Sequence, residues 1–114
     1  MNIFDKAAIT IKPFLDATGY EPKTTFWSDF TIAEMVSGID GIKDTYNRAF
    51  NEWQSDYVYL TELVMMLNWK IWYHHDTGNM KLAELYNELW EKTDQWALEH
   101  LAGEAKDYFL RTLD

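Results

Sequence analysis

The chain of 114 residues has no cysteine, only two prolines and five scattered glycines. Without cysteine it can form neither disulfides nor thiolate zinc sites, and it has no cysteine nucleophile, which fits a reducing compartment. The glycines make no phosphate-binding loop. Sustained alternation of apolar and polar residues is also missing, as are hairpin turns between strand-like runs, so no strands are expected.

Basic residues are scarce, since 10 Lys and Arg stand against 19 Asp and Glu, for a net charge of −9. This balance disfavours direct binding to nucleic acid and to anionic membranes. No run approaches the roughly 20 apolar residues of a membrane span, and the first residues do not read as a signal peptide. We expect a cytoplasmic protein whose acidity serves solubility. The more specific alternative is that the acidic surface mimics nucleic acid.

Apolar and aromatic residues are plentiful, at 47% and 17% of the chain. A chain of this length is expected to form one domain, residues 1–114, with a core that needs no disulfide or metal. The pattern predicts an all-α, compact bundle of about five or six helices, built on a central antiparallel helical hairpin.

The central helix of this bundle is predicted at Tyr57–His75. At 100° per residue its apolar side chains form two stripes on nearly opposite sides. The first stripe contains Leu60, Leu63, Val64, Leu67, Ile71 and His74. The second stripe contains Val58, Met65, Trp69 and Trp72.

Capping and breaking residues predict the other helices. Residues 24–30 (TTFWSDF) are expected to be irregular, with aromatic side chains buried over the end of the bundle. The first predicted helix runs from a cap at Asn2 to about Ala17, with a kink or break at Pro13. The next two run from a Thr31–Glu34 capping box to Gly38 and from a cap at Asp40 to Gln54. After the central helix, one runs from Met80, preceded by Gly78 and Asn79, to Ala102, and the last runs from Glu104 to Leu113.

Residues that suggest catalysis or metal binding have simpler explanations. His74 and His75 are adjacent, so they point about 100° apart on a helix and cannot hold one metal ion together. Glu84, Glu88 and Glu91 share a face opposite the apolar stripe, which is typical of a solvated surface. The three serines, Ser28, Ser37 and Ser55, lie in no nucleophile motif. We therefore predict no enzyme, no catalytic residue, no metal and no cofactor.

Residues Thr31–Phe50 have the outline of a helix-turn-helix, because a short helix, a glycine turn and a longer helix follow one another. The second helix would present Asp40, Asp44 and Glu52 against only Lys43 and Arg48. A hairpin built for packing is the simpler interpretation, and a DNA-binding regulator remains an alternative.

The second stripe of the central helix, with Trp27, is the predicted partner-binding set. One interpretation is that the first helix or residues 24–30 cover Val58, Met65, Trp69 and Trp72 within the chain. The other is that these side chains pair two copies as a homodimer or bind a protein partner, since Trp, Tyr and Met are enriched in interface cores.

Four strings, TTFWSDFTIAEM, IKDTYNRAFNEW, YLTELVMMLNWKIW and LYNELW, resemble a family of small uncharacterised proteins of prophages and other mobile elements of gut bacteria. The resemblance runs from about Thr24 to the end and carries no activity or site. It implies a cytoplasmic, phage-related setting. The sequence thus predicts a non-enzymatic protein–protein interaction module, with two alternatives: an acidic inhibitor or nucleic-acid mimic that acts on a nucleic-acid-handling enzyme, and the DNA-binding regulator.

Overall fold

A computed structural model describes residues 3–113 of the chain. This part consists of six α-helices and contains no strand, which confirms the predicted all-α fold. Their bounds are α1 Ile3–Thr18, α2 Phe26–Val36, α3 Gly38–Trp53, α4 Tyr57–Asp76, α5 Met80–His100 and α6 Gly103–Leu113. No helix within residues 3–113 is both long and apolar enough to cross a membrane.

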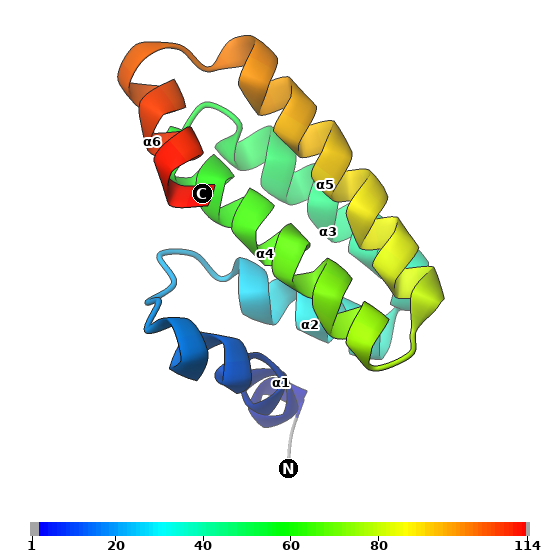
Figure 1. Ribbon diagram of the computed structural model, residues 1–114. Coiled ribbons are helices and arrows are strands. Elements are labelled where there is room, and N and C mark those ends of the chain that lie inside the picture. Colours follow the sequence, from blue (N-terminus) through cyan, green and yellow to red (C-terminus); the bar gives the residue numbers. More distant parts are fainter. Residues whose placement is uncertain (1–2, 114) are drawn as a thin grey trace.

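Helix α4 lies at the centre of the bundle (Figure 1). It pairs most extensively with α5, which forms the predicted antiparallel hairpin, and α6 folds back onto its first half. Helices α2 and α3 pack on each other and cover a further side of α4, while α1 lies outside α2.

Local chemistry explains where the central helices begin and end. The Asp56 carboxylate accepts hydrogen bonds from the backbone N–H groups of Val58 and Tyr59 at 3.1 and 3.3 Å and so caps α4. Asn79 caps α5 through a 3.3 Å bond from the Leu82 N–H. Gly78 separates the two helices with a φ of 83°, a conformation that costs glycine little. These ends agree with the sequence prediction.

The sequence predicts a kink or a break at Pro13, and there is no break, because α1 is one continuous helix from Ile3 to Thr18. Pro13 is exposed to solvent, where a carbonyl left without a donor can bind water. Gly19 ends the helix with a φ of 66°. The predicted cap at Asn2 lies outside the described residues.

The prediction that a capping box at Thr31 and Glu34 opens the second helix is wrong. Helix α2 already begins at Phe26, because the Thr24 hydroxyl accepts the Phe26 N–H at 3.2 Å and the irregular segment becomes its first turns. Helix α3 likewise begins at Gly38, so Asp40 lies in its first turn instead of capping it.

The core is rich in aromatic side chains from α2, α3 and α5 around the first stripe of α4. Phe26, Trp27 and Phe30 are all buried in the main core cluster, not at the end of the bundle. The first stripe of α4 is buried as predicted, apart from the half-buried Ile71. Helices α3 and α5 supply the facing side chains Ile42, Tyr46, Ala49, Leu85, Tyr86 and Leu89.

Helices α2 and α3 approach closely at the turn around Ser37, and Gly41 permits this approach. A Cβ atom at Gly41 would lie 2.4 Å from the Ser37 Cβ and 3.3 Å from the Ala33 carbonyl oxygen. Both atoms are fixed to the backbone, so the turn itself would have to open. Gly41 therefore fixes the narrow end of the space between the two helices.

We expect Gly41→Ala to lower the free energy of unfolding by about 1–3 kcal/mol because of this overlap. Helix propensity alone would give the opposite sign, since alanine is favoured over glycine by about 1 kcal/mol in a helix interior. Urea unfolding followed by circular dichroism measures the difference. Asn51→Ala, on the exposed side of the same helix, is the matched control and should change stability little. A Gly41→Ala variant more stable than wild type would contradict the overlap.

Candidate functional site

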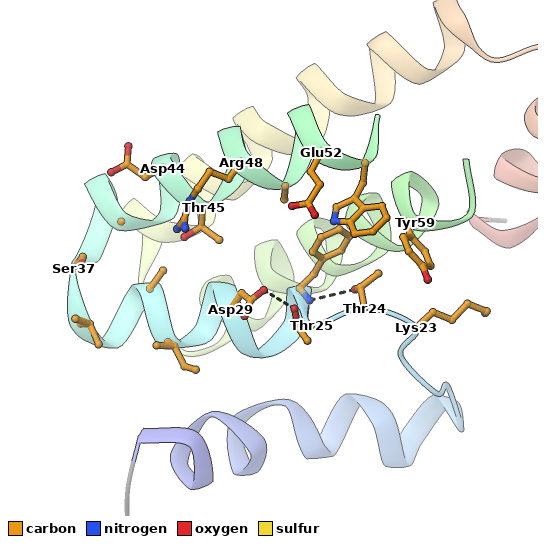
Figure 2. A pocket seen from close by; sticks show the side chains of 17 residues that line it. Lys23, Thr24, Thr25, Asp29, Ser37, Asp44, Thr45, Arg48, Glu52 and Tyr59 are labelled. Carbon is orange, nitrogen blue, oxygen red and sulfur yellow. Dashed lines mark hydrogen bonds between the residues drawn. The ribbon is translucent and has the colours of Figure 1, made fainter. Parts of the chain in front are cut away.

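A groove runs along the outer side of the bundle between α2 and α3 (Figure 2). Its volume is about 770 Å³, within the range of roughly 300–1,000 Å³ that is usual for binding sites. The two helices diverge from the Ser37 turn towards Thr24 and Tyr59, so the groove widens along its length. Phe26 from α2 and Trp53 from α3 are the two large aromatic side chains of these helices that line it.

The floor of the groove is apolar and its sides are charged. The buried and half-buried apolar side chains that line it are Phe26, Ile32 and Ala33 from α2 and Ala49 and Trp53 from α3. Small side chains near the narrow end leave room for another backbone to approach. Charged side chains at its edges are Lys23, Asp29, Asp44, Arg48 and Glu52.

The charged side chains of α3 at the groove form a regular row. Asp44, Arg48 and Glu52 are four residues apart, so they follow one side of the helix at intervals of about 6 Å. The side chains of Arg48 and Glu52 extend towards α2, whereas Asp44 lies at the outer edge (Figure 2). None of the three forms an ion pair with another residue of the described part of the chain.

A buried polar cluster holds the far side of α2 against α4 and α5. The Glu34 carboxylate accepts hydrogen bonds from His74 Nε2 at 2.8 Å and from the Tyr86 hydroxyl at 2.5 Å. Lys70 Nζ lies 3.2 Å from the same oxygen and donates to Thr31 Oγ1 at 2.6 Å. Thr31 in turn donates to the Trp27 carbonyl at 2.7 Å. Every described polar end in this cluster therefore has a partner.

The cluster shifts the titration of its members in directions that reflect burial and charge. Burial alone would raise the pKa of Glu34, but the His74 hydrogen bond, the Lys70 charge and the Tyr86 hydroxyl outweigh it and hold the pKa below its ordinary value. Burial lowers the pKa of Lys70 against the opposing effect of Glu34. Burial, followed by the Glu34 charge, raises the pKa of Tyr86 well above its ordinary value.

The low pKa of Glu34 links this group to the dependence of stability on pH. The carboxylate stabilises the fold above its ordinary pKa of 4.5, and this contribution is lost as the pH falls through the lowered value.

A second buried carboxylate, Glu62, ties the α1–α2 connection to α4. It accepts hydrogen bonds from the backbone N–H groups of Lys23 at 2.7 Å and Thr24 at 2.9 Å, and from the hydroxyls of Thr24 and Tyr20. Glu62 is only 1% exposed, so these bonds replace the water that the charge has lost. The connection from Tyr20 to Thr24 is thereby fixed beside the wide end of the groove.

The predicted partner-binding residues do not form one exposed surface. Trp27 is 1% exposed, and its ring lies 5.7 Å from that of Trp69 and 4.5 Å from that of Phe14. Trp69 is half-buried against Phe14, 5.4 Å away, so α1 and Trp27 cover this part of α4. Val58 and Met65 are half-buried as well, and Trp72 alone is open to solvent, at 57%.

The other candidate residues lie apart from one another. His74 is buried in the polar cluster and His75 is exposed, as the helical geometry predicted. Glu84, Glu88 and Glu91 are exposed on α5. Among the described residues, no three His, Asp or Glu side chains are grouped so that they could hold a metal ion.

The helix-turn-helix outline corresponds to α2 and α3, joined by the single residue Ser37. The DNA-binding motif uses a turn of about 3–4 residues between its helices, so the connection here is shorter than that motif requires. Asp29, Asp44 and Glu52 also lie at the groove between the two helices.

Comparison of the chain with protein-family models, with curated proteins and with solved structures gave no match. The site must therefore be interpreted from its own geometry.

Proposed function

We propose that this protein is a non-enzymatic protein–protein interaction module and that the α2–α3 groove is its binding surface. The groove itself carries the proposal: an apolar floor containing Trp53 lies between rows of charged side chains that have no ion-pair partner in the described chain. Apolar centres with polar edges are typical of protein interfaces. The resemblance to mobile-element proteins supports a cytoplasmic adaptor or inhibitor role in a phage-related setting.

Buried contacts that hold α2 and the segment beside the wide end in place favour binding over catalysis. Helix α2 is held from behind by the Glu34 cluster, and the segment beside the wide end is held by Glu62. The groups of this cluster whose pKa values are shifted, Glu34, Lys70 and Tyr86, face the core and do not line the groove. A rigid, preformed surface loses little entropy when a partner binds.

We expect Thr45→Trp, which places a large ring in the groove, to abolish partner binding while the fold is kept. Thr45 is half-buried at the groove and projects from α3. The control is Glu88→Trp, which adds the same ring to the exposed side of α5. Tagged wild type and both variants are expressed in the native host, and co-purified proteins are quantified by mass spectrometry.

The proposal predicts at least one protein retained by wild type and Glu88→Trp and reduced at least about tenfold with Thr45→Trp, since a filled groove loses the contacts that carry affinity. A partner retained equally by all three proteins would place binding elsewhere. No protein enriched above the tag alone would contradict the function.

One observation favours a second candidate, the acidic inhibitor. The chain carries a charge of −9, and Glu84, Glu88 and Glu91 lie exposed along one helix. Such a surface attracts a basic partner from a distance, and this attraction weakens as the salt concentration rises. Self-association through the second stripe of α4 has less support, because only Trp72 of that stripe is exposed.

A further inference from the structure

We infer that the partner element bound by the α2–α3 groove is an amphipathic helix whose edge carries a basic, an acidic and a basic residue at intervals of four. This inference rests on the proposed function and specifies the chemistry of the partner. The observation behind it is the row Asp44, Arg48 and Glu52 on α3, beside the apolar floor.

The length of the groove suits a helix. Helix α2 forms one wall over 11 residues, which corresponds to about 16 Å or three helical turns. Ala33, Thr45 and Ala49 line the groove with small side chains, and Phe26 and Trp53 line it with larger rings. A helix with apolar residues at i, i+3, i+4 and i+7 presents a stripe of matching length to this floor.

The charges define the edge of that helix. Two carboxylates on α3 flank one guanidinium, and Asp29 adds a further carboxylate on the opposite wall. A helix alongside α3 meets this row best with Lys or Arg opposite Asp44 and Glu52, and with Asp or Glu opposite Arg48. The row reads the same in both directions, so the expectation holds for a parallel or an antiparallel partner.

A second copy of the chain does not supply this pattern. No Lys or Arg in the sequence is followed by an acidic residue four positions later and by another Lys or Arg eight positions later. The two basic residues with an acid four positions on, Lys12 and Arg48, are followed by Tyr20 and Asp56. The complementary helix must therefore belong to another protein.

The test uses two designed helical peptides of about 15 residues. They share one apolar stripe and one composition. The first carries Lys-x3-Glu-x3-Lys along its edge, and the second carries the same residues as Glu-x3-Lys-x3-Lys. Binding to the full chain is measured by calorimetry, and ¹⁵N chemical-shift changes locate the peptide. We expect the first peptide to bind about tenfold more tightly, with the largest shifts at Thr45, Arg48 and Ala49.

Arg48→Glu separates specific pairing from general attraction. The variant is more acidic, so general attraction to a peptide of net positive charge would strengthen binding, whereas loss of the Arg48–Glu pair weakens it about tenfold. Lys43→Glu makes the same charge change on the same helix, away from the groove, and should not weaken binding.

Three results would overturn the inference. Arg48→Glu could bind the first peptide as tightly as wild type or more so, the two peptides could bind equally, or neither could bind in a saturable manner. Wild-type self-association in sedimentation that is lost with Thr45→Trp would identify a second copy as the occupant and would overturn it as well. In each of these cases, co-purification with Thr45→Trp, compared with its control Glu88→Trp, still decides separately whether the groove binds a protein.

Discussion

Glu34→Leu is expected to lower the free energy of unfolding by about 3–5 kcal/mol, because it leaves the buried Lys70 ammonium without its counter-ion. Lys70 is fully buried, and Glu34 lies 3.2 Å from its Nζ. The substitution also removes the acceptor for the His74 ring and the Tyr86 hydroxyl. Equilibrium urea unfolding, followed by circular dichroism, measures the loss.

The matched control for this prediction is the double variant Glu34→Leu/Lys70→Met. Replacing both members of a buried ion pair by apolar residues of similar volume is often close to neutral, so the double variant should be more stable than Glu34→Leu alone. If the double variant loses as much stability as Glu34→Leu and Lys70→Met lose in sum when measured singly, the two side chains do not interact. A Glu34→Leu protein within about 1 kcal/mol of wild type would contradict the cost assigned to a buried charge.

Glu62→Leu is the second substitution with a large expected effect, a loss of about 3 kcal/mol, because hydrogen bonds to a charged group contribute roughly 1.5–3 kcal/mol each and are not additive. The backbone N–H groups of Lys23 and Thr24 lose their acceptor. The connection between α1 and α2 would then loosen, and α1 with it. Amide hydrogen exchange of α1, compared with that of α5, measures the effect.

Two variants serve as controls for the Glu62 experiment. Glu62→Gln keeps one acceptor oxygen and the shape of the side chain, so it should cost less. Glu21→Leu removes an exposed carboxylate from the same connection and should leave the exchange of α1 unchanged. If the amides of α1 exchange at wild-type rates in Glu62→Leu, the carboxylate does not hold the connection to α4.

The parts of the fold that follow from local chemistry could be predicted from the sequence. Gly78 and Asn79 mark the turn between α4 and α5 because capping and left-handed turns depend on neighbouring residues alone. The first stripe of α4 and the burial of His74 followed from the helical period. Residues 3–113 form six helices in the expected order.

The predictions failed, or were incomplete, where long-range polar contacts decide the structure. Glu62 and Lys70 looked like interruptions of an apolar helix, yet both are buried because residues about forty positions earlier supply their partners. Thr31 and Glu34 had the spacing of a capping box, but both side chains bond to Lys70 on α4. Helix α2 begins before them, at Phe26. The spacing of residues within one helix cannot predict hydrogen bonds to residues on another helix.

The groove could not be predicted for the same reason. Its shape depends on how α2 and α3 diverge from the turn at Ser37, where Gly41 permits their close approach. One signal was available in the sequence: Asp44, Arg48 and Glu52 recur every four residues on the polar side of α3. Charges at this spacing are usual on any solvent-facing side of a helix, and the partner-binding set predicted from the sequence is centred on α4 instead.

Position-resolved photo-crosslinking tests most directly whether the α2–α3 groove is the surface through which this protein acts. A photoreactive amino acid is placed singly at Thr45 in the groove, at Trp72 on α4 and at Glu88 on α5, and each variant is irradiated in cells of the native host. The proposal predicts a discrete adduct with another protein from position 45 and none from positions 72 and 88. An adduct between two copies of the chain from position 72, with none from position 45, would contradict it.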